Sequence, residues 1–406
     1  MIDISRAITI IDREAGPLGN EKVAISRCVG RVLDEDIIAD SDLPPFDRSQ
    51  MDGFAVIAAD TLSKASALNI VGESAAGRGW HRTMRNGEAV RIMTGAPVPA
   101  GADAVQKLEL ARESLDLRLS GGAANRVVLR EGAKKGSFIV RQGSEIKKGT
   151  TVFKASEVIT ENMIAAIAAF GYANVKVAKQ PRVAILGTGS EIVEITKRPG
   201  RDQIRNSNSV MLDSLCRKFG GEPTIYPNAK DNVEELRTAI KNAAKTNDIL
   251  VVTGGVSVGK YDHTKAALAE LGAEIFFEKV RLRPGKPTVF GRLGRTLIFG
   301  LPGNPVSAAV TFHLFVRETI LQMQRASKTG LRNGFAILGV DAKGARERDT
   351  YLPSRLETNK LGQLMAYPLK WQGSSDFIGY ARADSLVFVP RGKILAKGDV
   401  ARIAHL

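Results

Sequence analysis

The sequence predicts a multidomain protein of α/β and β type, and three observations lead to this fold class. The chain has 406 residues, which is too long for one ordinary hydrophobic core. Between Arg182 and about Gln324, apolar strand-like runs alternate with amphipathic helices, which is typical of a parallel sheet covered by helices on both faces. Before and after this region, short alternating runs separated by Gly and Pro predict β domains.

The N-terminal part of the chain predicts a domain with an insertion. Residues from about Asp52 to Gly149 contain short strand-like runs such as EAVRI, DAVQKLE and RVVLR, which indicate a small β domain. Helix-forming segments, ISRAITIID near the start and SEVITENMIAAIAAFGY from Ser156, flank it. We expect these two segments to pack together as one domain that the β insertion interrupts.

The central region predicts a three-layer α/β domain. Its expected strands are RVAIL, DILVV, EIFFE and TLIFG, at residues 182–186, 248–252, 274–278 and 296–300. In SNSVMLDSLCRKFGG, the apolar residues Leu212, Leu215, Cys216 and Phe219 follow helical spacing, and Gly220 suits a left-handed helix stop.

Two more helix starts are predicted in this region. Asp231 with Glu234 resembles a capping box, and Leu236, Ile240 and Ala243 continue the apolar stripe. In GLPGNPVSAAVTF, Asn304 is expected to cap the helix and Pro305 to occupy its first position.

The C-terminal runs FAILGV, QLMAYPL and DSLVFVP predict a β-barrel or sandwich. The expected domain boundaries are 1–48 plus 150–180 for the interrupted domain, 49–149 for the insertion, 181–326 for the α/β domain and 327–406 for the last domain.

The chain is basic, but its charge is spread along the sequence. Lys and Arg number 58 against 43 Asp and Glu, a net charge of +15. Such a chain can bind nucleic acid, a membrane surface or anionic small molecules. The basic clusters are short, and no aromatic residues are interleaved with them. We therefore expect a solvated basic surface and no nucleic-acid partner.

Targeting signals and cysteine usage predict a cytoplasmic location without a membrane partner. The start of the chain lacks the features of a secretory signal, and no apolar run reaches membrane-spanning length. Cys28 and Cys216 are the only cysteines and are expected to be buried thiols. The four histidines lack metal-ligand spacing, and His313 is expected to be a hydrogen-bonded core residue.

Two predicted strands end in motifs suited to anion binding. In VVTGGVSVGKYDHT, Thr253, Gly254 and Gly255 end a buried strand, and Ser257 and Asp262 follow. Glycines let backbone amides approach an anion closely, and ligands of open α/β sheets bind where strands end. The alternative is a plain tight turn.

AILGTGSEIVE repeats this arrangement, with Gly187 to Gly189 and Glu191 after an apolar run. The chain contains neither GxGxxG nor GxxxxGK[ST], which removes the usual support for dinucleotide binding or Walker-type ATP hydrolysis.

Cations and acids cluster elsewhere. EKVRLRPGKPTVFGRL carries Lys279, Arg281, Arg283 and Lys286, and its prolines stiffen a loop suited to phosphate or another oxyanion. The alternative is a solvated edge strand.

DLPPFDRSQMDGFAV carries Asp42, Asp47 and Asp52, which could bind magnesium, although aspartates that cap local amides are preferred. Thr94 and Gly95 in VRIMTGAPVPAGADAVQ indicate a turn after a strand. A magnesium-dependent reaction of anionic substrates fits these residues better than a Ser/His/Asp triad.

Taken together, LPPFDRSQMDGFAV, VRIMTGAPVPAGADAVQ, GTGSEI, RNSNSVML, VVTGGVSVGKYD, RPGKPTVFG and GLPGNPVSA resemble, in this order, the molybdopterin molybdotransferase family. That family includes bacterial MoeA and the E domain of gephyrin. The resemblance implies a three-layer α/β molybdopterin-binding domain, an inserted β domain, an interrupted N-terminal linker domain and a C-terminal β-barrel. It also implies a cytoplasmic homodimer in which Asp52 and Thr94 of one chain face the α/β domain of its partner.

The resemblance also implies the chemistry. Adenylated molybdopterin and molybdate react with the help of Mg²⁺, and molybdenum cofactor and AMP leave. A molybdopterin adenylyltransferase and cofactor-accepting enzymes would be natural neighbours. No residue pattern distinguishes molybdate from tungstate.

Site residues follow by motif matching. The resemblance implies catalytic roles for Asp52, Thr94, Glu191 and Asp262, and metal binding by Asp231, Asp262 and Glu191. It implies substrate binding by Asn206, Ser207, Asn208, Thr253, Gly254, Gly255, Ser257, Lys279, Arg283, Lys286, Pro302, Pro305 and Ser374. Of these, Lys279, Arg283 and Lys286 are expected to hold molybdate or phosphate oxygens.

The sequence departs from the family pattern at Ser190 and Asn232, where an Asp is usual, at Lys260, where a Glu is usual, and at Arg283, where a Lys is usual. The changes away from acidic residues make the cleft more positive, which favours oxyanions and weakens magnesium binding. The alternative function is a non-catalytic, pterin-binding scaffold of the same fold. Retained Asp52, Glu191 and Asp262 argue against it.

Overall fold

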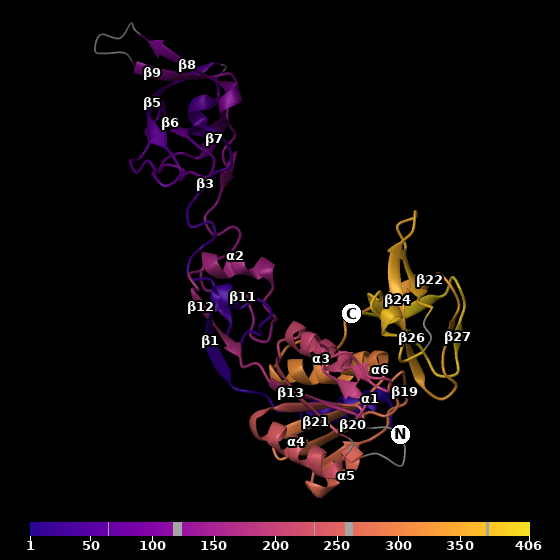
Figure 1. The fold of residues 1–406 in the computed structure, drawn as a ribbon. Coiled ribbons are helices and arrows are strands. Elements are labelled where there is room, and N and C mark those ends of the chain that lie inside the picture. The colour runs from indigo at the N-terminus through magenta and orange to yellow at the C-terminus, as the bar shows by residue number, and fades with distance from the viewer. Residues whose placement is uncertain (64, 117–123, 231, 256–262, 371–372) are drawn as a thin grey trace. The chain divides into compact units, whose positions relative to one another are not determined.

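The computed structural model describes residues 1–406 except 64, 117–123, 231, 256–262 and 371–372 (Figure 1). The chain forms two compact units. The first contains Met1–Glu35, Ala155–Ile164 and Ala173–Leu406, and the second contains Asp36–Lys154 and Ala165–Tyr172. The predicted residues Asp231, Ser257, Lys260 and Asp262 lie outside the described residues.

A six-stranded sheet forms the middle of the first unit. Its strand order is β16-β13-β17-β21-β20-β18. The bounds are β13 (Arg182–Thr188), β16 (Glu222–Ala229), β17 (Ile249–Thr253), β18 (Glu274–Phe277), β20 (Val289–Leu293) and β21 (Thr296–Leu301). The strands β16, β13, β17 and β21 are parallel, whereas β20 is antiparallel to both of its neighbours. The sheet is therefore mixed, and not wholly parallel as the sequence pattern predicted.

Alternate residues of these strands enter two cores. Val183, Ile185 and Val251 belong to a core shared with helices on one face, whereas Ala184 and Leu186 belong to a core on the other face. The first face carries α1 (Ile4–Glu14), α3 (Ser207–Lys218), α6 (Pro305–Thr311), a π-helical turn η4 (Phe312–Val316) and α7 (Arg317–Met323). The second carries α4 (Val233–Thr246) and α5 (His263–Glu270). This alternation confirms the three-layer α/β domain (Figure 1).

Helix ends agree with the sequence only in part. Gly220 adopts a φ of +82° just after α3, as a left-handed stop requires. The N-cap of α4 is Asn232, whose Oδ1 accepts from the Glu234 and Glu235 amides, so the capping residue predicted at 231 is one position too early. Asn304 occupies the N-cap position of α6, but its side chain makes no capping hydrogen bond.

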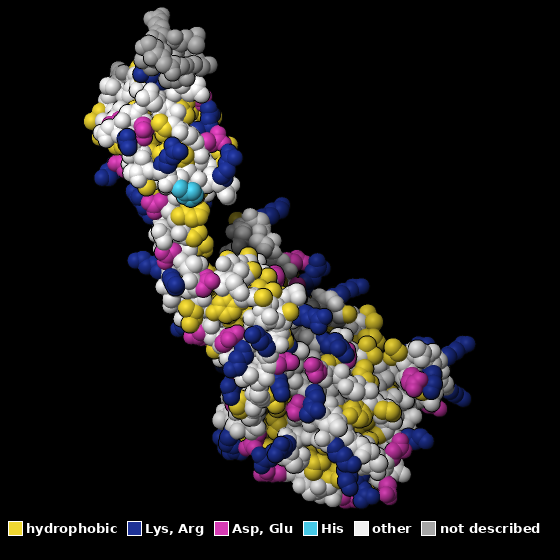
Figure 2. Space-filling model, turned by 90° about the vertical axis from the view of Figure 1, so that its left-hand side faces the viewer, with side chains coloured by type: hydrophobic (Ala, Val, Ile, Leu, Met, Phe, Trp, Pro, Cys, Tyr) yellow, Lys and Arg dark blue, Asp and Glu magenta, His cyan; other side chains and the backbone are white. Residues whose placement is uncertain are grey.

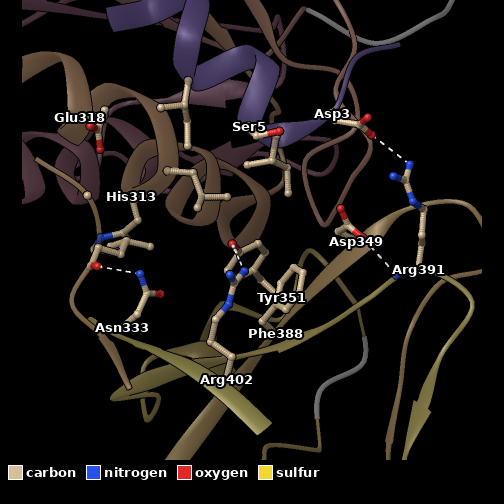
Figure 3. Close-up of a pocket in the computed structure, with 15 residues that line it drawn as sticks. Asp3, Ser5, His313, Glu318, Asn333, Asp349, Tyr351, Phe388, Arg391 and Arg402 are labelled. Atoms are coloured by element: carbon tan, nitrogen blue, oxygen red, sulfur yellow. Dashed lines mark hydrogen bonds and ion pairs between the residues drawn. The ribbon is translucent and has the colours of Figure 1, made fainter. Parts of the chain in front are cut away.

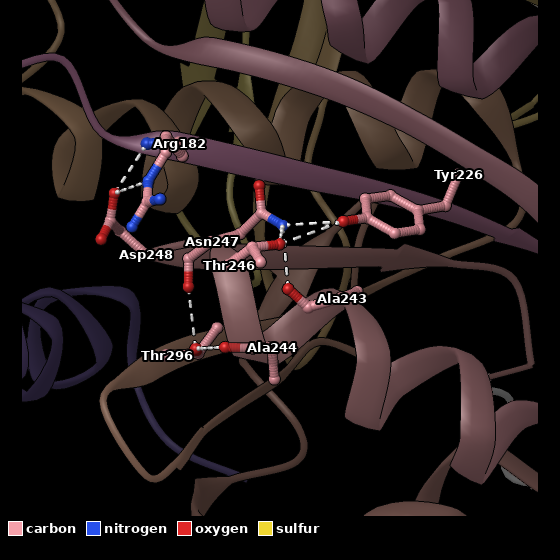
Figure 4. A network of polar contacts seen from close by, with 8 residues as sticks. All are labelled: Arg182, Tyr226, Ala243, Ala244, Thr246, Asn247, Asp248 and Thr296. Carbon is pink, nitrogen blue, oxygen red and sulfur yellow. Dashed lines mark hydrogen bonds and ion pairs between the residues drawn. The ribbon is translucent and has the colours of Figure 1, made fainter.

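The amino ends of the parallel strands are tied together by a polar network (Figure 4). Asp248, just before β17, accepts from the backbone amide of Arg182 at 2.8 Å. Asn247 Nδ2 donates to Tyr226 Oη at 3.0 Å and to the carbonyl of Ala243 at 2.8 Å. Thr296 Oγ1 is 2.7 Å from the carbonyl of Ala244 and 2.8 Å from that of Asn247. These contacts fix the connections between helices and strands at the amino ends of the strands, which is the end of the sheet opposite to the carboxyl ends.

The chain enters and leaves the insertion through paired strands. β1 (Asn20–Ala24) pairs antiparallel with β12 (Asn174–Ala178). Segments before and after the insertion therefore pair with each other, as an N-terminal domain interrupted by the insertion requires. The predicted packing of the first helix on the helix after Ser156 is wrong. α1 instead contacts α7 and η4, because its buried residues Ile4, Ala7 and Ile11 belong to the α/β core. The later helix is α2 (Glu161–Ala169).

The second unit contains the inserted β domain. Its six-stranded sheet has the order β7-β4-β6-β5-β9-β8. The bounds are β4 (Gly53–Val56), β5 (Ser66–Ser74), β6 (Glu88–Ile92), β7 (Ala104–Lys107), β8 (Ala111–Asp116) and β9 (Ala124–Leu129). Short pairs join β2 (Ile37–Ile38) to β11 (Thr151–Phe153) and β3 (Arg48–Ser49) to β10 (Ile139–Val140). Phe54, Val56 and Leu129 are among the buried residues of its core.

The C-terminal domain is a closed barrel. The ring is formed by β24 (Asp349–Thr358), β25 (Leu364–Pro368), β22 (Asn333–Leu338), β28 (Val400–His405) and β26 (Ser385–Val389), which returns to β24. β19 (Leu282–Arg283) adds to β24, β23 (Ala342–Lys343) pairs with β27 (Ile394–Leu395), and α8 (Phe377–Tyr380) connects β25 to β26. The barrel, rather than a sandwich, is therefore the observed form.

The surface and the core agree with the composition. In the face shown in Figure 2, Lys and Arg side chains are scattered and interspersed with Asp and Glu. Cys28 and Cys216 are buried and free, as predicted. Among the described helices, none is both long and apolar enough to cross a membrane.

Candidate functional site

The main candidate site lies where three parallel strands end. β13, β17 and β21 are adjacent and in register at Gly187, Thr253 and Leu301. The chain leaves β13 toward β16 on one side and later returns to β17 on the other, so the strand order reverses between β13 and β17. Ligands of open α/β sheets bind at such a reversal. A cavity of about 940 Å³ is found here, and we call it the strand-end cavity.

Its described lining residues include most of the predicted substrate-binding set. They are Gly187, Thr188, Gly189, Glu191, Ile192, Pro199, Gln203, Ile204, Arg205, Asn206, Ser207, Asn208, Thr253, Gly254, Gly255, Pro287, Pro302, Gly303, Asn304, Pro305, Ser375 and Phe377. The structure thus brings together residues that the sequence separates by more than a hundred positions.

Two glycines let the floor of the cavity form. Gly254 and Gly255 have φ values of +99° and +62°, which side chains disfavour. A Cβ on Gly254 would collide with the carbonyl oxygen of Thr188, and a Cβ on Gly255 would lie 2.6 Å from Thr264 Oγ1. The turn after β17 therefore packs directly against the end of β13, which explains why this position carries a Gly-Gly pair.

The start of α3 forms one wall. Asn206 Oδ1 accepts from the Ser209 amide at 3.0 Å and so caps the helix. Asn208 Nδ2 donates to Thr253 Oγ1 at 3.0 Å and to the carbonyl of Gly303 at 2.7 Å. Asn208 therefore ties the start of the helix to the ends of β17 and β21, and the positive end of the helix dipole faces the cavity.

Several buried polar atoms around this cavity have no hydrogen-bond partner among the described residues. They are Thr188 Oγ1, Asn208 Oδ1, Ser209 Oγ and Thr264 Oγ1. Leaving such an atom unpaired costs about 1–3 kcal/mol, so native structures keep few of them. Thr188 and Asn208 line the cavity directly. The two unpaired atoms are themselves buried, so a ligand in the cavity meets exposed polar lining residues such as Gln203 and Ser207.

The described residues supply few ligands for a metal ion. Among them no group of three or more His, Cys, Asp or Glu side chains is placed to hold a metal. Glu191 lines the cavity, but Asp231 and Asp262, the other predicted ligands, lie outside the described residues. Proteins usually hold Mg²⁺ with one or two carboxylates together with waters and substrate phosphates, and Glu191 is the one predicted carboxylate among the described residues that line the cavity.

The predicted cations Lys279, Arg283 and Lys286 do not line the cavity, although Pro287 does. The carbonyl of Lys279 accepts from the Ile2 amide at 3.0 Å, and Arg283 ends β19 beside the barrel. Arg205 is the one Lys or Arg among the described lining residues. It was not predicted as a site residue, although the motif RNSNSVML contains it.

The barrel domain contributes to the rim of the cavity. Asn304 Nδ2 donates to Ser374 Oγ at 2.7 Å, and the Val306 amide donates to the carbonyl of Ser374 at 3.1 Å. Ser374 thus joins the start of α6 to the barrel, and its neighbours Ser375 and Phe377 line the cavity. Neither Ser375 nor Phe377 was predicted, because helical or strand periodicity does not indicate contacts between domains.

In the second unit, Asp52 and Thr94 contact each other. Asp52 Oδ1 accepts from the Thr94 amide at 2.7 Å and from Thr94 Oγ1 at 2.9 Å. These two hydrogen bonds lower the pKa of Asp52. Both side chains are exposed, so the pair is accessible to a ligand or a second chain. The other two acids of this segment also accept from backbone amides, but these amides are not local as predicted. Asp42 accepts from the Lys148 amide and Asp47 from the Gln142 amide, which lie 106 and 95 positions away in the sequence.

A second cavity, of about 410 Å³, lies between α1, η4 and the barrel (Figure 3). Asp3 pairs with Arg281 and Arg391, and Arg402 lies over the Phe388 ring at 3.9 Å. The charged groups of this cavity thus have partners within the protein. Burial lowers the pKa of His313 to about 3, and its Nδ1 has no partner among the described residues. His313 is therefore a neutral core residue, but not the fully hydrogen-bonded one that we expected.

Comparison with known proteins places these features in one family. Residues 2–171 match the MoeA N-terminal region (domain I and II), residues 184–322 a probable molybdopterin binding domain, and residues 336–406 the MoeA C-terminal region (domain IV). A molybdopterin molybdenumtransferase of Staphylococcus aureus is 33% identical over 96% of this chain and 92% of its own length. The chain belongs to the molybdopterin molybdenumtransferase family. It is therefore classed with transferase enzymes of molybdenum cofactor biosynthesis.

Other members of the family agree with this assignment. The molybdopterin molybdenumtransferase of Staphylococcus epidermidis is 31% identical over 96% of this chain and 92% of its own. The molybdopterin biosynthesis MoeA protein of Pyrococcus horikoshii is 30% identical in sequence. Its crystal structure superposes with a TM-score of 0.81 and covers 100% of this chain and 99% of its own. The strand-end cavity falls within the region that matches the probable molybdopterin binding domain, apart from its two barrel residues.

Proposed function

We propose that this member of the family is a molybdopterin molybdotransferase. It takes adenylated molybdopterin and molybdate, inserts molybdate into the dithiolene, and releases AMP and molybdenum cofactor. The observation that carries the proposal is the strand-end cavity, whose polar lining at the start of α3 and at the ends of β13 and β17 falls within the region that matches the probable molybdopterin binding domain. Its volume of about 940 Å³ lies within the usual range for small-molecule sites.

The chemistry of the lining suits an anionic substrate. α3 directs its N-terminal amides to the cavity, and Arg205 adds a positive charge. Asn208 holds the start of α3 against the ends of β17 and β21, and the neighbouring Ser207 is an exposed hydrogen-bonding residue of the lining. The Gly254-Gly255 turn allows the backbone to approach a phosphate closely.

The remaining expectations are parts of the same proposal. Mg²⁺ would shield the phosphate oxygens of the substrate with help from Glu191, Asp231 and Asp262. A homodimer would bring the Asp52–Thr94 pair of one chain to the cavity of the other. The two free, buried cysteines favour the reducing cytoplasm. A molybdopterin adenylyltransferase would supply the substrate, and cofactor-accepting enzymes would take the product.

The experiment is an assay of AMP release from adenylated molybdopterin by the purified protein, with and without molybdate and Mg²⁺. We expect release that depends on molybdate and falls at least tenfold in Asn208→Ala, while Asn242→Ala, an exposed asparagine outside the strand-end cavity, keeps wild-type activity. Tight binding of the pterin without turnover in any condition would contradict the proposed enzymatic function and support the alternative, a non-catalytic, pterin-binding scaffold.

A further inference from the structure

We propose that Phe377, on the barrel domain, stacks on a flat heteroaromatic ring of the substrate in the strand-end cavity. The inference rests on the proposed function, since it names a specificity residue of the same site. Phe377 is the one aromatic side chain among the described residues that line the cavity. Pterin and adenine both offer a flat π face, which is the chemistry that Phe377 would recognise.

The ring is accessible although it is large and apolar. Phe377 is 47% exposed and Ile378, next to it, is 65% exposed. Other residues of the same short helix are more buried, and Tyr380 packs against the α/β core. Burial raises the pKa of the Tyr380 hydroxyl. One side of α8 is therefore anchored in the core, while Phe377 remains open toward the cavity.

The backbone that carries the ring is held by hydrogen bonds around the start of α8. Ser374 joins the loop to the start of α6 through Asn304 and the Val306 amide. Asp376 caps α8, since its Oδ1 accepts from the Gly379 amide at 2.9 Å. The Phe377 amide donates to the Ser375 carbonyl at 2.9 Å. A backbone held in this way does not have to be ordered when a ligand stacks on the ring, which favours binding.

Other residues of the lining supply the hydrogen-bonding groups that stacking lacks. Exposed polar side chains that can bind the edge of a heteroaromatic ring come from the α/β domain, at Gln203 and Ser207. Phe377, from the barrel, offers no hydrogen bond and only a face. The cavity thus combines edge recognition from one domain with face recognition from another, which gives the barrel a direct role in substrate binding.

The test compares Phe377→Ala, Phe377→Leu, Phe377→Tyr and Phe377→Trp, with Ile378→Ala as the matched control on the same helix. Isothermal titration calorimetry measures the binding of AMP and, under oxygen-free conditions, the binding of molybdopterin. Loss of one stacked ring weakens binding roughly 5- to 100-fold. We expect a loss of this size in Phe377→Ala and Phe377→Leu for the probe whose ring stacks, whereas Phe377→Tyr, Phe377→Trp and Ile378→Ala stay within about twofold of the wild type. AMP and molybdopterin, measured separately, show which ring is stacked.

In the AMP-release assay, the alanine variant should raise KM more than it lowers kcat, because the stacking is present before and during the reaction. Wild-type-like binding of both probes by Phe377→Ala would overturn the inference, as would a leucine variant that binds as well as the tryptophan variant. A molar mass of Phe377→Ala below that of the wild type in light scattering would also overturn the inference, because the ring would then be a contact between subunits. If the wild type itself binds neither probe and releases no AMP, the proposed function fails instead.

Discussion

At the scale of single residues, Asp52 is the clearest case of a side chain tuned by its neighbours. Its two hydrogen bonds come from one residue, Thr94, through the amide and the hydroxyl. They stabilise the carboxylate and so keep the pKa of Asp52 below its ordinary value. The stabilisation that this gives is present above the unfolded pKa and is lost as the pH falls through the folded pKa.

Replacing Thr94 by Val should raise the pKa of Asp52, because the hydroxyl donor is lost while the amide remains. Thr94→Ser, which keeps a hydroxyl, should stay near the wild type. Carbon-13 NMR titration of the Asp52 carboxyl measures the difference. Equal pKa values in the valine and wild-type proteins would show that the hydroxyl does not matter.

His313 gives a pH dependence of stability. Its pKa is lowered to about 3 by burial, so the unfolded chain binds more protons than the folded one between pH 3 and 6.5. Stability should therefore fall as the pH drops through this window, by at most about 1.4 kcal/mol per pH unit. His313→Gln should show a smaller change in the urea midpoint between pH 7 and 5. An unchanged pH dependence in the variant would assign the effect to other groups.

At the scale of secondary-structure elements, the turn after β17 controls the cavity. Gly254→Ala adds a Cβ that meets the Thr188 carbonyl, so the turn must move away from β13. Gly272→Ala is the matched control, since its φ of +70° carries a similar backbone cost but its Cβ meets nothing within 4 Å. We expect molybdopterin binding to drop more than tenfold in Gly254→Ala and to persist in Gly272→Ala. Loss of binding in both would point to general destabilisation.

The polar network at the amino ends of the parallel strands should affect the stability of the protein without affecting the strand-end cavity. Thr296→Val removes the hydroxyl that bonds two carbonyls, at a cost of about 1–3 kcal/mol, whereas Thr296→Ser keeps it. Urea unfolding should show this loss in the valine variant, and AMP release per folded molecule should remain at the wild-type level. A fall in that activity would mean that the two edges of the sheet are coupled.

The elements that the sequence predicted well are those with strong local signals. The strands at 182–186, 248–252 and 296–300 are apolar after their first residue, and α3 has an apolar stripe and a Gly220 stop. β16 was not predicted because Pro223 and Pro227 interrupt its strand pattern. A strand can contain these prolines when it lies at the edge of the sheet, as β16 does. β20 was missed because its segment was interpreted as a Pro-stiffened loop, and Gly291 interrupts its pattern.

At the scale of the whole molecule, the site combines distant segments. Motif matching identified Asn208, Thr253 and Gly254, but Phe377 depends on how the barrel docks on α6, which no local pattern encodes. The expected domain boundaries at 48, 150, 180 and 326 stay predictions. The proposed homodimer is a further property that only the assembled protein can test.

A mixture of two inactive chains tests the shared active site. If each site takes Asp52 from one chain and Glu191 from the other, co-refolded Asp52→Asn and Glu191→Gln chains form some sites with both residues intact. We expect AMP release to recover to roughly a quarter of the wild-type level, as random pairing of equal amounts predicts. No recovery would indicate that both residues serve a site within a single chain.

The most direct test of the central claim remains the release of AMP from adenylated molybdopterin. The account predicts release that requires molybdate and is lost in Asn208→Ala, together with formation of molybdenum cofactor in equal amount. Release that is absent, or that proceeds equally in the Asn208→Ala variant, would contradict the assignment of the strand-end cavity as the active site.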